Sequence, residues 1–436
     1  MEQLINPWSS QQYKDYAKLR DQFGIQEFKF ELPNAPRIFR RGVIFGHRGF
    51  EYIYDRIKRG GRFGVLTGLM PSGKMHFGHK MTIDQVVYYQ NLGADIHITV
   101  ADIEAFASRG ISLEKAKKIA LEEYVPSYIA LGMNPDRAEV YFQSRRQEVK
   151  DIAWKLAKKV NLSEFLAIYG FSGETNMAHI FSPLIQVGDI LHVQYEKFGG
   201  RRPIIVPVGV DQDPHMRLTR DIVSRWRMFS ISPQERGMGV FYKGENVKKR
   251  LEEARNKLEE CGFQKFEMNV PYRALYVLDA APQDYIRIDD ALISLEKNFN
   301  LESFYPPAAT YHRLMTGLTG GKMSSSMPET AIFLTDSPEE AMKKVRNAKT
   351  GGGATLEEHR KYGGNPEICA VYELFVYHLV DDDRYLRKIY EDCKAGERVC
   401  GACKKEATEL LTQWLRDLHE RREWAKEHVK DIVSWD

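Results

Sequence analysis

The sequence predicts an α/β chain built on a Rossmann-like, doubly wound parallel sheet, with an N-terminal extension, an inserted subdomain and a C-terminal helical domain. From residue 63 onward, short apolar runs alternate with helix-like segments, which is typical of parallel sheets. The chain has 436 residues, which is longer than a chain that folds around a single hydrophobic core usually is, and 43% of them are hydrophobic. Residues 1–62 are polar and irregular, whereas the residues from about 336 are charged and helix-like.

Residues 1–62 are expected to form an extension that has no core of its own. The stretch INPWSSQQYKDYAKLRDQFG favours one short helix after Pro7-Trp8-Ser9. The stretch RIFRRGVIFGHRGFEYIYDRIKRG favours a second segment with apolar and aromatic residues. We expect both segments to pack against the domain that follows.

Residues 63–335 are expected to form the sheet domain. Strands are predicted at 63–67, 96–100, 138–144 and 203–209. One helix follows the first strand and ends at Gly93, and a second helix starts after Ser112 and reaches Leu131. Parallel doubly wound sheets bind ligands at the carboxyl ends of their strands, so we expect the functional site there.

Two further units are predicted from their patterns. At about 230–300 an inserted subdomain is expected, in which Val247, Leu251, Ala254 and Leu258 fall on one helical face. Its lysines and arginines either contact nucleic acid or form a solvated helical face. Residues 336–436 include KKEATELLTQWLRDLHERREWAKEHV, an amphipathic helix of the kind found in bundles.

The composition excludes several classes of protein. The 63 basic and 60 acidic residues leave a net charge of only +3, so contact with nucleic acid would be local rather than driven by a global field. No apolar run is long enough to span a membrane, and Met1-Glu2-Gln3-Leu4 does not resemble a secretory leader. Five cysteines are an odd number and do not suggest a disulfide framework. We expect a cytoplasmic protein with no membrane or DNA partner.

The stretch PSGKMHFGHK (residues 71–80) places two histidines around a glycine where the first strand ends and a helix begins. It can be interpreted as a metal pair, a helix cap or a cradle for nucleotide phosphates. The metal pair lacks a third ligand nearby. The start of a helix favours an anion, and Gly73, Gly78 and Lys74 would allow close approach and add a positive charge. The stretch matches neither of the usual glycine-rich nucleotide motifs.

A second stretch, TGLTGGKMSSSMPE (residues 316–329), combines two glycines, a lysine and three serines. Alone it can be an ordinary linker or a mobile clamp on a triphosphate. Together, H-x-G-H and K-M-S-S-S resemble the paired signature of the class I aminoacyl-tRNA synthetases. The resemblance implies ATP as substrate with Mg²⁺, and catalysis by charge and position. The catalytic residues that it implies are His76, His79, Lys322, Ser324, Ser325 and Ser326; the ATP-binding residues are Pro71, Ser72, Gly73, Lys74, Met75, Phe77, Gly78 and Met323.

Most of the chain resembles the archaeal and eukaryotic type of tryptophanyl-tRNA synthetase. The sequence segments that show this resemblance are FRRGVIFGHR, GVDQDPHMRLTRD, EEHRKYGGNPE and VYELFVYHLVDDD. It implies activation of L-tryptophan to tryptophanyl-AMP, transfer to tRNA(Trp), an anticodon-binding role for 336–436 and a homodimer. Two alternatives remain open: a tyrosyl-tRNA synthetase, and a synthetase-like RNA-binding paralogue without activation chemistry.

The tryptophan-binding residues transfer less directly from the family. An indole needs a flat apolar slot and one acceptor for its N–H. Asp189 and Gln186, in PLIQVGDIL, are the candidate acceptors, although tyrosyl enzymes direct an aspartate from a similar stretch. Asp189 can also be a helix cap or a solvent-facing carboxylate. The remaining positions implied by the resemblance are Leu66, Thr99, Glu104 and Gln212.

Four of the five cysteines, Cys369, Cys393, Cys400 and Cys403, lie in the C-terminal part. Four thiolates at this spacing can hold Zn²⁺ or a [4Fe–4S] cluster, or they can be free thiols. Some tryptophanyl enzymes carry an iron–sulfur cluster at four cysteines with nearly the same spacing, the first interval being one residue longer here. The sequence therefore leaves two expectations for these four cysteines, a metal site and free thiols.

Overall fold

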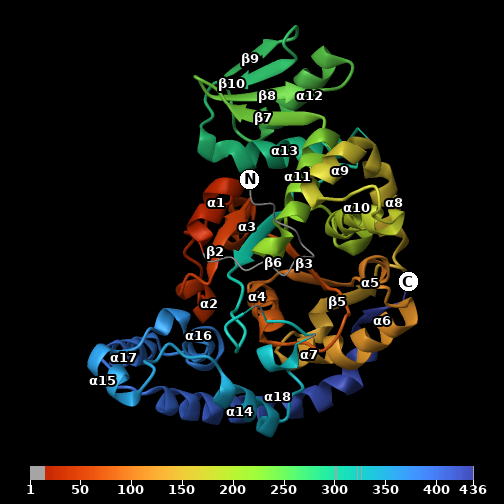
Figure 1. Ribbon diagram of the computed structural model, residues 1–436. Helices are drawn as coiled ribbons and strands as arrows, with labels where there is room; N and C mark the ends of the chain where they lie inside the picture. The colour runs from red at the N-terminus through yellow and green to blue at the C-terminus, as the bar shows by residue number, and fades with distance from the viewer. Residues whose placement is uncertain (1–14, 300–301, 322, 326, 436) are drawn as a thin grey trace.

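A sheet of mostly parallel strands forms the centre of the computed structural model, which describes residues 15–299, 302–321, 323–325 and 327–435 (Figure 1). Within these residues, eight strands hydrogen-bond in the order β1-β2-β11-β6-β3-β4-β5-β12. The strands from β11 to β12 run parallel, and β2 runs antiparallel to β11. The bounds are β1 Gln26–Glu27, β2 Ile44–Arg48, β3 Gly64–Leu69, β4 Asp95–Val100, β5 Ala138–Phe142, β6 Ile204–Gly209, β11 Ala308–His312 and β12 Val433–Ser434.

This order confirms the doubly wound sheet, and the four predicted strands are β3, β4, β5 and β6. Successive side chains leave a strand on opposite faces, so Val65 and Leu66 enter two different apolar clusters. One face packs against α4, α7 and α18, and the other against α8, α10 and α11. The bounds are α4 Phe77–Asn91, α5 Asp102–Arg109, α8 Gln147–Leu156, α9 Leu162–Tyr169, α10 Met177–His192 and α11 Asp213–Trp226.

The N-terminal segment is part of the sheet, beyond the packing role that the sequence indicated. Its elements are α1 Tyr16–Phe23, α2 Arg37–Arg40 and α3 Phe50–Arg59, together with β1 and β2. In the stretch predicted to be helical after Pro7-Trp8-Ser9, α1 begins at Tyr16 with Asp15 as its N-cap, and the residues before Asp15 lie outside the described part of the chain. β2 pairs with β11, so residues 44–48 and 308–312, which are far apart in the sequence, are neighbours in the sheet.

The helix predicted from Ser112 to Leu131 is interrupted in the structure. It consists of α6 Leu113–Ile119, a π-helical turn η1 Ala120–Tyr124 and α7 Val125–Ala130. Pro126 explains the break, because a proline has no N–H to donate and its ring crowds the carbonyl of residue i−4. The amide of Val125 instead donates to the carbonyl of Ala120, five residues back.

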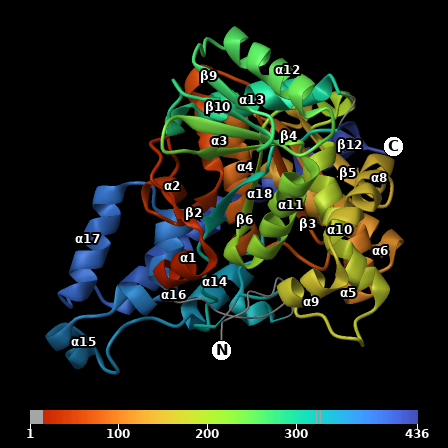
Figure 2. The ribbon, with the colours of Figure 1, turned by 90° about the horizontal axis from the view of Figure 1, so that it is seen from above.

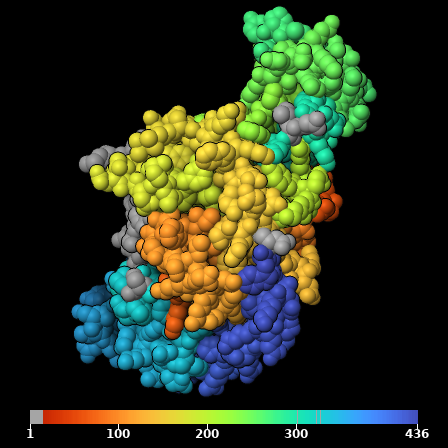
Figure 3. Space-filling view, turned by 90° about the vertical axis from the view of Figure 1, so that its right-hand side faces the viewer, coloured from red at the N-terminus to blue at the C-terminus, as the bar shows by residue number. Residues whose placement is uncertain are grey.

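Residues 229–297 form a lobe that projects from the body (Figures 1 and 3). Its antiparallel sheet has the order β7-β8-β10-β9, and its helices cover an apolar core separate from the others. Helix α12 confirms the predicted helix, with Leu251, Ala254 and Leu258 buried. The bounds are β7 Phe229–Pro233, β8 Met238–Tyr242, α12 Val247–Glu260, β9 Phe266–Asn269, β10 Ala274–Val277 and α13 Tyr285–Lys297.

The C-terminal part is helical, as predicted, and Figure 2 shows α15 and α17 standing out at one side of the molecule. The longest helix, α18, ends at Ile432, and the following β12 then pairs with β5, which the sequence pattern did not indicate. Among the described residues, we find no helix with the length and apolar character needed to span a membrane. The bounds are α14 Pro338–Asn347, α15 Leu356–Tyr362, α16 Ala370–Leu374, α17 Asp383–Lys394 and α18 Cys400–Ile432.

Candidate active site

A cavity of about 360 Å³ opens at the carboxyl ends of β3, β4, β6 and β11. This is where a doubly wound sheet places its ligand. Residues more than 240 positions apart in the sequence line it, so the fold brings the two predicted loops to one site. The predicted site residues that line it are Leu66, Ser72, His76, Gly78, His79, Thr99, Glu104, Gln186, Asp189, Gln212 and Met323.

The two histidines form the cap of helix α4. The Nδ1 of His76 accepts the N–H of Gly78 at 3.1 Å, and the Nδ1 of His79 accepts the N–H of His76 at 3.1 Å. Their rings stack with centroids 3.9 Å apart. Because each Nδ1 is an acceptor, the ring proton of each neutral histidine lies on Nε2. Burial lowers the pKa of His79 to about 4, so this ring is neutral at physiological pH.

The structure shows the helix cap, and the cap is compatible with a phosphate cradle because it uses only the Nδ1 atom of each ring. Gly78 permits this arrangement, because a Cβ at this position would lie 2.9 Å from Cε1 of His76. The amino end of α4 would offer partial positive charge to an anion in the cavity. The described residues contain no group of three or more histidine, cysteine or carboxylate side chains placed to hold a metal ion.

The lysine–serine loop lies against the histidine loop. The hydroxyl of Ser325 donates to the carbonyl of Lys74 at 3.3 Å, and the amide of Ser324 donates to Thr330 Oγ1 at 3.1 Å. Met323 is buried, with its sulfur close to the position that a side chain on Gly78 would take. The predicted residues Lys322 and Ser326 lie outside the described residues.

Not every predicted ATP-binding residue turns its side chain to the cavity. Met75 and Phe77 are fully buried, and the ring of Phe77 packs against His378 and Trp414. Only their backbone groups can therefore contribute to nucleotide binding. Pro71 is buried beside a different small cavity, and Lys74 is exposed at the edge of the loop.

Asp189 is the most buried ionisable group in the cavity, with an exposed fraction of 0%. It accepts hydrogen bonds from Thr99 Oγ1 at 3.2 Å, from the Tyr141 hydroxyl at 2.8 Å and from Gln143 Nε2 at 2.5 Å. Burial raises the pKa of its carboxyl to about 7, against the opposing effect of these three donors. The alternatives of a helix cap and a solvent-facing carboxylate are therefore wrong.

Tyr141 and Gln143 were not anticipated from the sequence. Tyr141 lies within β5 and Gln143 directly follows this strand, a spacing of two that places both side chains on the same side. That side belongs to the cluster beneath α10, which carries Asp189. The alternation of side-chain direction along VYFQS could have predicted that Tyr141 and Gln143 share a face. Using it required knowing which face of the sheet holds the ligand.

The remaining predicted residues surround Asp189 and the mouth of the cavity. Glu104 lies in α5, and its amide donates to Gln143 Oε1 at 3.4 Å. Gln212 precedes α11, whose first residue Asp213 is fully buried and pairs with Arg48 of β2 at 2.6 Å. The N-terminal segment thus fixes the backbone next to Gln212.

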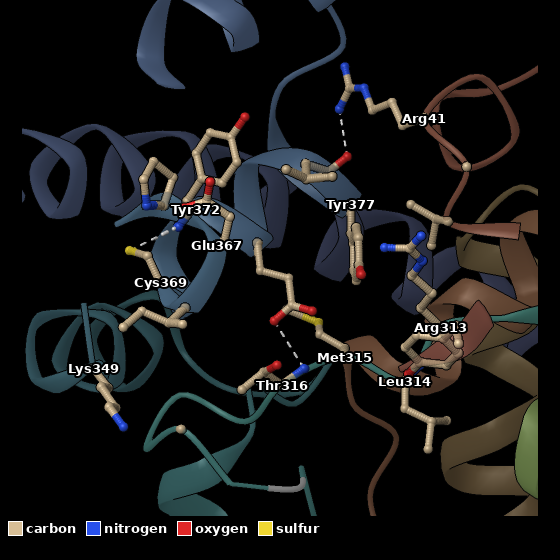
Figure 4. Close-up of a pocket in the computed structure, with 18 residues that line it drawn as sticks. Arg41, Arg313, Leu314, Met315, Thr316, Lys349, Glu367, Cys369, Tyr372 and Tyr377 are labelled. Carbon is tan, nitrogen blue, oxygen red and sulfur yellow. Dashed lines mark hydrogen bonds between the residues drawn. The ribbon is translucent and has the colours of Figure 1, made fainter. Parts of the chain in front are cut away.

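A larger cavity of about 540 Å³ lies behind the lysine–serine loop, between the N-terminal segment and the C-terminal helices (Figure 4). It shares Leu314 and Met315 with the first cavity and contains none of the predicted tryptophan- or ATP-binding residues. Its carboxylate, Glu373, accepts the amide of Thr316 at 3.0 Å. Burial raises the pKa of Glu373 above its usual range.

The four C-terminal cysteines, Cys369, Cys393, Cys400 and Cys403, line one small cavity, so the fold brings them together. Burial, with the other thiols contributing less, raises the pKa of Cys393 to about 11. The sulfur of Cys403 accepts the Nε–H of Arg398 at 3.0 Å. Burial also raises the pKa of Cys403, so a metal would have to displace the protons of Cys393 and Cys403.

Comparison with known proteins agrees with this geometry. The family described as "tRNA synthetases class I (W and Y)" matches residues 58–241 and 291–416. The tryptophan–tRNA ligase of Methanosarcina acetivorans is 46% identical over 435 residues, which cover 99% of this chain and 98% of that protein. The corresponding ligase of Thermoplasma volcanium is 44% identical, with 98% and 99% covered. The crystal structure of the tryptophanyl-tRNA synthetase from Aeropyrum pernix superposes with a TM-score of 0.76 at 38% identity, covering 99% of both chains.

Proposed function

The chain belongs to the tryptophanyl-tRNA synthetases, within the class I family for tryptophan and tyrosine, and we propose how its cavity carries out their reaction. In the first step, the carboxylate of L-tryptophan attacks the α-phosphate of ATP and pyrophosphate leaves. In the second step, the terminal ribose hydroxyl of tRNA(Trp) takes the tryptophanyl group and AMP leaves. Magnesium enters with ATP and neutralises part of the phosphate charge.

One observation supports this proposal most strongly: a single cavity joins the paired histidines to a buried carboxylate with three donors. The Nε2–H groups of His76 and His79 would donate to the phosphate oxygens, on which negative charge develops during attack. A neutral ring suits this role because its Nδ1 can accept a backbone N–H while its Nε2–H donates to the phosphate. Lys322 and the serines after it would follow the departing pyrophosphate.

The other end of the cavity would hold the tryptophan side chain. Asp189 is the proposed acceptor for the indole N–H, with Thr99, Tyr141 and Gln143 holding its carboxylate in place. Glu104, Gln186 and Gln212 line the same end and would bind the amino group and the indole edge. Leu66 supplies apolar surface from β3.

The other parts of the chain would serve the tRNA and the assembly. We assign 1–62 as the extension, 63–335 as the catalytic domain with its insertion, and 336–436 as the anticodon-binding domain. We place the whole protein in the cytoplasm. A homodimer is supported by exposed apolar side chains on α8, α9 and the start of α10. Trp154 of α8 and Met177 of α10 are each 74% exposed, and Leu162 and Leu166 of α9 are exposed as well.

ATP–pyrophosphate exchange tests the activity, with tryptophan and tyrosine supplied in separate reactions. We expect exchange with tryptophan and none above background with tyrosine. Exchange with tyrosine alone would identify a tyrosyl enzyme. Exchange with neither amino acid would leave an RNA-binding paralogue and contradict the proposed function.

The cysteine cluster fits a soft metal in the number and kind of its donors. Its present spacing is not that of a ligand set, so the thiols would have to move together and release Arg398. We propose that Cys369, Cys393, Cys400 and Cys403 hold a [4Fe–4S] cluster or Zn²⁺, and no step of the reaction depends on it.

Metal analysis of protein purified without oxygen tests the proposal for the cysteine cluster. About four irons per chain with absorption near 400 nm are expected for a cluster, or about one zinc for a structural site. Cys261 lies in the lobe and serves as the reference thiol. Alkylation of all five thiols in the native protein at similar rates would contradict either metal.

A further inference from the structure

The backbone of Met75, immediately before His76, is held from both sides. Its N–H donates to Glu123 Oε1 at 3.4 Å, and its carbonyl accepts the N–H of Leu334 at 2.9 Å. Met75 is 0% exposed, so no water can replace either partner. The position of the ring of His76 therefore depends on where Glu123 and Leu334 lie.

Glu123 is in turn held by Arg422 of helix α18. One Nη of Arg422 donates to Glu123 Oε2 at 3.2 Å, and the other donates to its backbone carbonyl at 3.1 Å. The second nitrogen also donates to the Ser127 hydroxyl. Arg422 is only 5% exposed, and a buried arginine without its carboxylate is costly, so the pair is strongly constrained.

The π-helical turn η1 makes this contact possible. Glu123 lies inside this turn, between α6 and α7. A π-helical turn inserts one extra residue into a helix and so changes the direction of the side chains that follow. Here the carboxylate of Glu123 reaches Met75 with one oxygen and Arg422 with the other.

Leu334, the second partner of Met75, is held by the same helix. Its carbonyl lies 3.1 Å from Nε2 of His419. His419 and Arg422 are three residues apart, so they lie on one face of α18. Both contacts that fix Met75 therefore originate from one turn of α18, which packs beneath α7 and α14 (Figure 1).

We propose that Glu123 and Arg422 are positioning residues for the nucleotide loop, and that α18 sets the place of His76 and His79 relative to the phosphates of ATP. The inference rests on the proposed function, since it assigns these residues to the ATP end of the same cavity. The two residues touch neither substrate and act through the backbone of Met75. A local displacement of the turn of α18 that carries Arg422 would move the histidines, whereas the hydrogen-bond partners of Asp189 lie in or next to β4 and β5, outside this turn.

The test compares Arg422→Ala, Arg422→Lys and Glu123→Gln with Arg421→Ala in ATP–pyrophosphate exchange. Arg421 is the matched control, because it is an exposed arginine in the same helix turn that bonds only locally, to the carbonyl of Asp417. We expect Arg422→Ala to raise the KM for ATP about tenfold with an unchanged KM for tryptophan. Arg422→Lys should recover most of this loss, and Glu123→Gln should act in the same direction.

Thermal unfolding of each variant separates positioning from mere stability. A destabilised protein with an intact site has fewer active molecules, so its kcat falls only in proportion to the folded fraction while both KM values stay constant. That pattern, or equal effects of Arg422→Ala and Arg421→Ala, would overturn the inference. A wild-type protein without tryptophan-dependent exchange would instead contradict the proposed function, so the two failures are distinguishable.

Discussion

Replacing His79 by asparagine is expected to slow tryptophan activation by about 10²–10³-fold, because the variant lacks the donor that we propose for the reacting phosphate. The Oδ1 of asparagine occupies nearly the position of Nδ1 and can still accept the N–H of His76. The variant therefore retains the cap of α4 and removes only the Nε2–H. The measurement is the rate of ATP–pyrophosphate exchange at saturating ATP and tryptophan.

His79→Gln is the matched variant, because its Nε2–H₂ takes the position of the imidazole Nε2 while the acceptor at Nδ1 is lost. We expect His79→Gln to retain most of the wild-type activity, which His79→Asn loses. We also expect His79→Gln to have a lower thermal stability than the wild type. The reverse order of activities would show that His79 acts as a cap and not as a phosphate donor. Equal losses would leave no separate role for the Nε2 proton.

The second large effect is expected at Asp189, through the pH dependence of tryptophan binding. Burial raises the pKa of this carboxyl from 3.8 to about 7. In the proposed role, the ionised form would accept the indole N–H, whereas the protonated form has one acceptor fewer. Binding should therefore weaken as pH falls through about 7, with kcat/KM for tryptophan decreasing about tenfold per pH unit below it.

The matched variant is Asp189→Asn, which keeps the size of the side chain and cannot titrate. Its amide N–H₂ would face donors from Tyr141 or Gln143, so we expect a raised KM for tryptophan at every pH and no inflection near 7. The KM for ATP, measured in the same reactions, is the internal control. An inflection near 7 that persists in Asp189→Asn would assign the titration to another group.

The strands and the nucleotide loop could be predicted because their signals are local. The apolar alternation of 63–67 and 96–100 specifies strands by itself, and the stretch from Pro71 to Lys80 follows the first of them. The paired loops that line the cavity could be found for the same reason, because each motif is contiguous in the sequence.

The parts that were missed depend on contacts between distant segments. Tyr141 and Gln143 acquire their role only when α10 lies over β5, 46 to 48 residues later. The pairing of β12 with β5 joins residues 433 and 140, and no local pattern specifies such a partner. The only sequence signal for the π-helical turn at Glu123 is Pro126. A proline predicts that the helix is interrupted, but it does not predict a π-helical turn.

The lobe at 229–297 interrupts the chain between two neighbouring strands. β6 ends at Gly209 and β11, which pairs with it, begins at Ala308. A flexible segment of this length would add an entropic cost to closing the sheet. Because the lobe has an apolar core of its own, it can fold first and bring its two ends together. The effective loop is then much shorter, so the insertion would accelerate the late assembly of the central sheet instead of delaying it.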